Sequence, residues 1–199
     1  MPSAPHPTGT RTISRLDHLA KLTGFARDTS QGSATLDLDA AKAGQLLPGD
    51  DHYRAYVGPP GRFDFMSATQ FALLFTMGLR ETDKVLDIGC GSLRLGRLLI
   101  PFLLKGGYHG DDPNAWLIED GIERELGRDA VRIKQPVFSL GEDFDFERLG
   151  NRFDFIMAQS IATHCGPDYL ARMLAGARRV LKEDGVFLFT FKIHELDDL

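Results

Sequence analysis

The chain has 199 residues, of which 43% are hydrophobic and 26% are charged, and its formal net charge is -5 at pH 7. This composition is that of an ordinary globular protein with a core, and the negative charge argues against a general nucleic-acid or membrane-surface binder. No apolar run approaches the ~20 residues that cross a bilayer, and the N-terminus lacks the apolar core of a secretory signal. Two cysteines, Cys90 and Cys165, predict neither a disulfide framework nor a metal site. We therefore expect a cytoplasmic protein without a bound metal.

The first part of the chain has weak patterns. Residues 1–11 are rich in proline and small polar residues, which predicts a disordered tail. Residues 12–62 are predicted to form an arm of short helical and loop segments ahead of the main domain, residues 63–199. Within that domain, the capping-box pattern from Ser67 to Gln70 predicts the start of a helix that ends at Gly78.

The clearest pattern lies around residue 90. Val85–Ile88 reads as a short buried strand, and Gly89 and Gly91 allow a tight turn after it. Ser92 is placed to cap a helix, because apolar residues then recur at helical spacing. Those apolar residues are Leu95, Leu98, Leu99, Phe102 and Leu103. A strand, a glycine turn and a helix start form a site where backbone N–H groups point at a ligand.

The residues around this turn narrow the choice of ligand. Arg94 stands where a dinucleotide fingerprint has its third glycine, and the carboxylate of Asp87 would repel a pyrophosphate. The sequence from Asp87 to Gly91 resembles motif I of the class I S-adenosylmethionine (SAM)-dependent methyltransferases. The resemblance implies that this loop wraps the methionine part of SAM, with contacts from Asp87, Gly89, Cys90 and Gly91.

The same resemblance gives a role to the segment before the first strand. In the family, this segment folds over the cofactor, which implies that Tyr53, Arg54 and Tyr56 form a lid or a wall of the substrate site. A packed surface loop is the alternative.

The second strand is predicted at Tyr108–Asp112, and it ends 21 residues after Gly91. A carboxylate at this spacing, at the end of the next strand, can accept hydrogen bonds from ribose hydroxyls. The family pattern of glycine, aliphatic residue and acid assigns this role to Asp112, while Asp111 replaces the usual aliphatic residue. Asp112 also suits the start of the helix after Pro113, and both roles are compatible.

The third strand is predicted at Val137–Leu140. In the family, the residues after this strand often hold the adenine. The resemblance implies that Asp143 accepts a hydrogen bond from the adenine amino group and that Phe144 packs beside the ring, with Asp145 as an alternative acid. Because Glu142 and both aspartates lie close together, a solvated acidic loop is the other interpretation.

The fourth strand, Phe153–Ala158, is almost entirely apolar, as expected for a strand buried on both faces. The run from Phe153 to His164 resembles small-molecule methyltransferases, which place residues facing the transferred methyl group here. This implies cofactor contact for Gln159, acceptor contact for Ser160 and a general-base role for His164, whose pKa ordinarily lies near neutrality. A purely structural histidine is the alternative.

The last elements complete the pattern. A helix is predicted by the helical spacing of Leu170, Met173, Leu174, Ala177 and Leu181, and a turn at 183–185 and a strand at Val186–Phe191 follow. The run from Arg178 to Phe191 resembles the last shared motif of the family. Alternating strands and helices predict an α/β fold: a doubly wound, mostly parallel Rossmann-like sheet with helices on both faces. The family usually adds a helix and a hairpin, so the C-terminal strands are expected to be shortened or missing. The N-terminal arm or a second subunit, in a homodimer, would then cover the exposed edge.

These patterns together predict an enzyme, a SAM-dependent methyltransferase. It would move a methyl group to an oxygen or nitrogen of a small-molecule acceptor and release S-adenosyl-L-homocysteine (SAH). Because the sulfonium already activates the methyl group, the protein chiefly aligns it with the acceptor in a dry pocket. A non-catalytic SAM-binding or scaffold protein is one alternative. A nicotinamide-dependent oxidoreductase, which shares this kind of sheet, is another.

Overall fold

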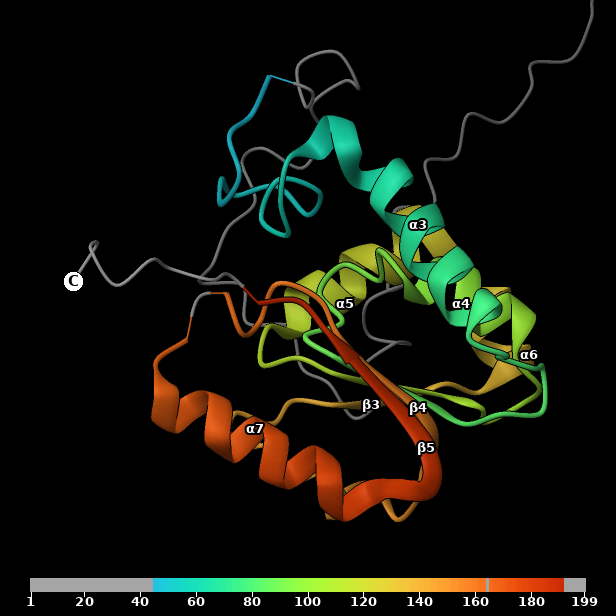
Figure 1. Ribbon diagram of the computed structural model, residues 1–199. Helices are drawn as coiled ribbons and strands as arrows, with labels where there is room; N and C mark the ends of the chain where they lie inside the picture. Colours follow the sequence, from blue (N-terminus) through green and yellow to red (C-terminus); the bar gives the residue numbers. More distant parts are fainter. Residues whose placement is uncertain (1–44, 164, 192–199) are drawn as a thin grey trace, which may run out of the picture. The chain divides into compact units, whose positions relative to one another are not determined.

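The computed structural model describes residues 45–163 and 165–191, and this part of the chain folds around a parallel sheet (Figure 1). The strand order is β3-β2-β1-β4-β5, and each neighbouring pair is parallel. The strands are β1 (Val85–Ile88), β2 (Tyr108–Asp111), β3 (Val137–Ser139), β4 (Phe153–Ala158) and β5 (Leu181–Phe189). The chain runs outward from β1 to β3 and then returns to place β4 beside β1, so the strand order reverses between β1 and β4. The predicted α/β, doubly wound class is confirmed.

Helices cover both faces of the sheet. Figure 1 shows α3 to α6 on one side and α7 on the other. The helices are α3 (Phe63–Thr76), α4 (Gly96–Phe102), α5 (Ala115–Gly121), α6 (Arg128–Lys134) and α7 (Pro167–Val180). Three short helical segments complete the described part of the chain: η1 (Pro60–Arg62) before α3, the π-helical η2 (Ile122–Leu126) between α5 and α6, and η3 (Phe146–Leu149) between β3 and β4. None of the helices in the described ranges is long and apolar enough to cross a membrane.

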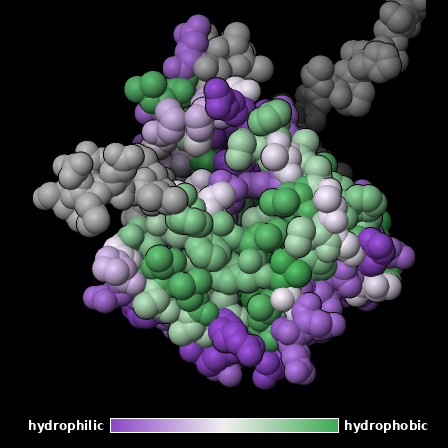
Figure 2. Space-filling view, viewed as in Figure 1, coloured by the Kyte–Doolittle hydropathy of each residue, from purple (hydrophilic) through white to green (hydrophobic). Residues whose placement is uncertain are grey.

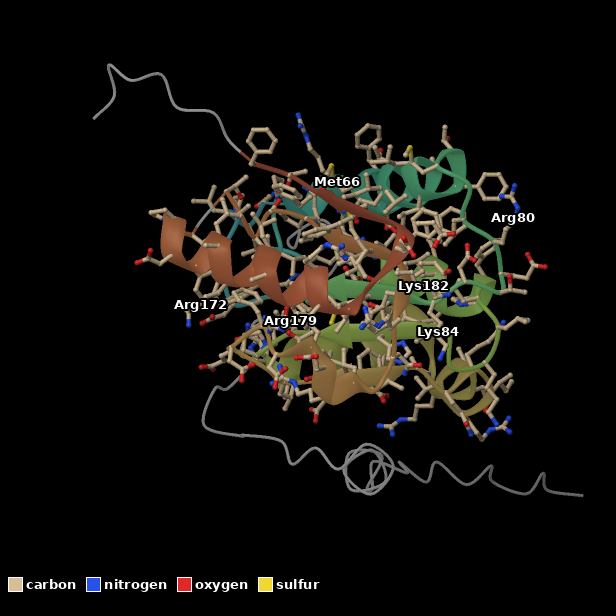
Figure 3. All side chains as sticks on the ribbon, turned by 60° about the horizontal axis from the view of Figure 1, so that its bottom comes forward. Met66, Arg80, Lys84, Arg172, Arg179 and Lys182 are labelled. Atoms are coloured by element: carbon tan, nitrogen blue, oxygen red, sulfur yellow. The ribbon has the colours of Figure 1, made fainter. Side chains whose placement is uncertain are left out.

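The core between α7 and the sheet follows from strand alternation. Leu86 and Ile88 of β1 point to this face together with Ile156 of β4, and Met173 and Ala177 of α7 pack against them. Near the start of β4, Asp154 accepts hydrogen bonds from the backbone N–H of Lys84 (2.8 Å) and from Nζ of Lys182 (2.6 Å). Figure 3 shows both lysines at this end of the sheet, where Asp154 joins the starts of β1 and β5.

Two predicted helix starts are wrong. The helix α3 begins at Phe63, directly after η1, so Ser67 lies inside it rather than at its N-cap. The hydroxyl of Ser67 instead accepts a hydrogen bond from Nε of Arg97 (3.2 Å). The predicted end is confirmed, because Gly78 follows the helix with a φ of +103°. Similarly, α4 begins at Gly96 and not after Ser92, since the residues between them form turns.

The strand β5 is longer than predicted and irregular. Phe153 of β4 pairs with Leu181, whereas Phe155 pairs with Val186, so the residues expected to form a turn bulge out of a continuous strand. β5 lies at the edge of the sheet, and Figure 2 shows hydrophobic residues gathered over this part of the molecule. The predicted tail, the predicted arm up to residue 44 and residues 192–199 lie outside the described residues.

Candidate functional site

A cavity of about 590 Å³ lies at the carboxyl ends of β1, β2 and β4. Such ends, at the point where strand order reverses, are where open α/β sheets bind ligands. The segment 48–59 roofs the cavity, and the other walls come from the strand ends and the loops after them. The lining residues include Tyr56, Val57, Gly89, Gly91, Arg94, Asp111, Asp112, Gly141, Phe144, Gln159, Ser160, Ile161 and Tyr169.

The glycine turn forms the floor of this cavity. Gly89 and Gly91 have φ values of +68° and +51°, which other residues rarely adopt. A Cβ on Gly91 would lie 2.6 Å from Cγ1 of Val57, so the roof rests on the bare glycine. The backbone N–H of Gly89 donates to the carbonyl oxygen of Asp111 (2.7 Å), so in this structure that N–H points to β2 and not to a ligand.

Asp112, the predicted ribose ligand, lines the cavity. Its Oδ2 accepts a hydrogen bond from the N–H of Gly91 (2.9 Å), and its Oδ1 accepts from the N–H of Asn114 (2.9 Å). Burial raises the pKa of Asp112, while these hydrogen bonds oppose the rise. Nδ2 of Asn114 also donates to Oδ1 (3.0 Å), so the carboxylate is fixed in place with one lone pair on Oδ2 left to accept from a ligand hydroxyl.

The structure does not bring Asp87 and Cys90 to the cavity. Asp87 is buried on the other side of the glycine turn, where its Oδ2 accepts a hydrogen bond from the Tyr108 hydroxyl (2.8 Å). Burial raises the pKa of Asp87 to about 7. Cys90 is also buried, with its Sγ against Gly110, and burial raises its pKa well above the ordinary value. Both side chains are therefore packed in the interior next to the glycine turn and do not face the cavity.

The cavity contains a cation that sequence reasoning did not assign to the site. Arg94 lines the wall next to the glycine turn, and its Nη1 donates to the carbonyl oxygen of Val57 in the roof (2.6 Å). Burial lowers the pKa of Arg94, and the carboxylate of Asp87 opposes this shift. The only sequence signal was a basic residue in place of the third glycine of the fingerprint.

Tyr53 and Arg54 do not line the cavity; they fasten its roof. The Tyr53 hydroxyl (2.9 Å) and Nε of Arg54 (2.7 Å) both donate to Oε1 of Glu125, in the π-helical turn. Nη1 of Arg97 donates to the other carboxylate oxygen (2.9 Å). Their neighbour Tyr56 does line the cavity, and its ring lies edge-on to Trp116 with centroids 5.3 Å apart.

The residues after β3 divide between cavity and solvent. Phe144 lines the cavity and lies edge-on to Tyr169, with ring centroids 4.6 Å apart. Asp143 does not line it: its side chain is 65% exposed and pairs with Arg148 through Nη1 (2.7 Å). Asp145 is also exposed. The acidic loop is therefore largely solvated, which was the alternative interpretation of the sequence.

The residues after β4 form the remaining wall. Gln159 and Ser160 both line the cavity, and Nε2 of Gln159 donates to the Ser160 hydroxyl (3.1 Å). A second cavity of about 470 Å³ adjoins the first; its lining is Ser160, Ile161, Cys165, Gly166 and Tyr169. His164 lies outside the described residues, so its predicted role as a base stays a prediction.

Known proteins resemble this chain in sequence and in fold. A family model described as a methyltransferase domain matches residues 86–187, which is 102 of the 199 residues. No curated protein matches the sequence. The chain resembles the PH0226 protein from Pyrococcus horikoshii with a TM-score of 0.55 and 23% identity, over 73% of this chain and 59% of that one.

Two further solved structures share the fold. One is a S-adenosylmethionine-dependent methyltransferase from Clostridium acetobutylicum, with a TM-score of 0.50 and 21% identity over 62% of this chain and 48% of that one. The other is the CcbJ methyltransferase from Streptomyces caelestis, with a TM-score of 0.50 and 21% identity over 66% and 52%. The chain thus spans about half the length of these two structures.

Proposed function

Because the chain belongs to the class I family of SAM-dependent methyltransferases, we propose that it binds SAM in the cavity and transfers the methyl group to an oxygen or nitrogen of a small acceptor. The products are the methylated acceptor and SAH. The cavity is large and concave, with few polar groups among apolar walls, as small-molecule sites usually are.

The observation that carries this proposal is the order of chemical groups along the cavity. Arg94 lies beside the glycine turn at the end of β1, and Asp112 follows β2. Phe144 lies beyond the end of β3. SAM is an elongated molecule with a carboxylate at one end, a ribose diol in the middle and a base at the other end. A guanidinium, a carboxylate and an aromatic ring in this order match those three parts.

The acceptor would enter where the two cavities meet. Ser160, Ile161 and Tyr169 line both, so a molecule in the smaller cavity can reach the larger one. When SAM is bound, its sulfonium supplies an activated methyl group. The chain's own contribution is then to hold the acceptor atom in line with that group and to exclude water beneath the roof. Ser160 and Gln159 are the polar side chains best placed to orient the acceptor.

Incubation with methyl-labelled SAM and the small-molecule fraction of a cell extract tests the proposal. We expect label to move from SAM to an extract component with wild-type protein. Transfer should fall at least about tenfold in Asp112→Ala, which removes a hydrogen bond to a charged group. Asp129→Ala is the matched control, because this exposed aspartate pairs with Arg132 at the surface.

Binding and thermal-shift measurements separate the alternatives. Tight binding of SAM without transfer to any component would favour a non-catalytic SAM-binding protein. A thermal shift with NAD but none with SAM would favour the nicotinamide-dependent oxidoreductase, and either result would contradict the proposal.

A further inference from the structure

The guanidinium of Arg148, in η3, joins three segments at the end of the cavity nearest β3. Its Nε donates to the Ser139 hydroxyl at the end of β3 (2.9 Å), and its Nη1 donates to Asp143 in the following loop (2.7 Å). Its Nη2 lies 3.4 Å from Oδ1 of Asp111, at the end of β2. One planar group thus fixes two strand ends and a loop relative to one another.

Gly141 makes direct packing contact with this guanidinium. A Cβ built on Gly141 would overlap Arg148, so the backbone of Gly141 lies directly against the planar group. Gly141 also lines the cavity, and its backbone N–H lowers the pKa of Asp111. At this end, the cavity wall is therefore a stretch of backbone that packs on Arg148 and lies near Asp111.

The arrangement also accounts for the unusual acid before Asp112. Asp111 is only 3% exposed, and burial raises its pKa, whereas Ser139 and Arg148 lower it. A buried carboxylate needs such partners, since an unpaired charge in the interior is strongly unfavourable. Without Arg148, Asp111 would be left with uncompensated charge beside the cavity.

The chemistry along the cavity shows which part of a ligand meets this wall. Arg94 matches the carboxylate of SAM and Asp112 matches the ribose diol, so the base is left for the end formed by Gly141 and Phe144. We propose that Arg148 is a positioning residue for the base of SAM, acting through Gly141 and Asp111 rather than by contact. This inference rests on the proposed function, because it requires that SAM binds in the cavity.

The proposal also gives a reason for the outward position of Asp143. The Nη1 of Arg148 holds its carboxylate on the solvent side of the loop. Arg148, and not Asp143, then shapes the base-binding end.

Calorimetry with two ligands tests this role. SAH carries both the amino-acid part and the base, whereas 5′-methylthioadenosine carries the base without the amino-acid part. In Arg148→Ala, we expect both ligands to bind about tenfold more weakly, because the base wall is lost in each case. In Arg94→Ala, only SAH should bind more weakly. Arg148→Lys should resemble Arg148→Ala, since lysine keeps the charge but cannot reproduce the planar set of donors.

Arg179→Ala is the matched control. Arg179 lies on α7, as Figure 3 shows, and pairs with Glu147 of the same turn η3 at 3.1 Å, but it does not line the cavity. Its removal should leave both affinities unchanged. Unchanged binding of 5′-methylthioadenosine to folded Arg148→Ala and Arg148→Lys would overturn the inference while leaving the proposed function intact. Failure of wild-type protein to bind SAH would refute the function itself, and the inference with it.

Discussion

At the residue scale, two buried carboxylates beside the glycine turn have different roles. Asp87 and Asp112 were both expected to contact the cofactor, yet only Asp112 lines the cavity. Strand alternation explains the difference, because Asp87 lies in β1 one residue before the cavity-lining Ile88 and therefore points to the other face. Asp87 meets the Tyr108 hydroxyl there.

The buried position of Asp87 predicts a dependence of stability on pH. Its pKa rises from 3.8 to about 7 in the folded protein, so the folded state holds the proton more tightly than the unfolded state. Stability from this group is present at low pH and is lost as pH rises through the range from about 4 to 7. The free energy of unfolding can be measured with urea at pH 5 and at pH 8. Between these pH values, that of the wild type should fall by about 2–3 kcal/mol more than that of Asp87→Asn.

Asp129→Asn controls for general charge effects, because this aspartate is exposed. Its stability should follow the wild type at both pH values. If Asp87→Asn and wild type lose the same stability between the two pH values, Asp87 does not titrate in this range.

Single residues also show how far the sequence could specify the site. The position of Asp112 was predictable, because its spacing from the glycine turn follows from strand and helix lengths. Arg94 was missed because its role depends on contact with Val57, 37 residues earlier in the chain. The outward position of Asp143 depends on its ion pair with Arg148, five residues later. Arg148 lies in η3, which no periodic pattern in the sequence predicted.

At the element scale, the roof over the cavity is fastened by a buried acid. Glu125 is only 5% exposed and bridges Arg54, before α3, to Arg97 in α4. The Tyr53 hydroxyl reaches the same carboxylate across 72 residues of sequence. Such distant contacts leave no local pattern, so the sequence assigned Tyr53 and Arg54 to substrate contact, whereas the structure places them on Glu125.

Glu125→Gln should loosen the roof. The change keeps the side-chain size but removes the charge that two partly exposed arginines share. We expect the free energy of unfolding to fall by about 1–3 kcal/mol. Limited proteolysis should cut the segment 48–59 faster than in the wild type. Glu147→Gln, which affects an exposed pair with Arg179, should change neither; equal cleavage of wild type and Glu125→Gln would contradict the anchoring role.

At the scale of the whole molecule, the fold was largely predictable. The bounds of β1 and β4 match the structure residue for residue, because short apolar strands between turns carry a strong signal. α6 was not predicted, and the N-caps of α3 and α4 were misplaced by five and three residues, since they lie at Arg62 and Leu95 and not at Ser67 and Ser92. These features depend on tertiary packing, such as the contact of Ser67 with Arg97, rather than on local capping patterns.

The edge of the sheet gives a prediction about assembly. β5 is an edge strand of nine residues, and Phe191 beyond it is 61% exposed. An apolar edge of this kind favours pairing with another chain, so we expect a homodimer. Light scattering should give the mass of two chains, and Phe191→Lys should shift it toward one. A wild-type protein that stays monomeric and soluble at high concentration would contradict this expectation.

The central claim is that the cavity at the strand ends binds the cofactor through Asp112, and calorimetry with SAH tests it most directly. Wild-type protein should bind one SAH per chain. Asp112→Ala should bind it more weakly by about 1.5–3 kcal/mol, the usual effect of losing a hydrogen bond to a charged group. The absence of binding to intact, folded wild-type protein would contradict the claim, and so would equal affinity in the variant.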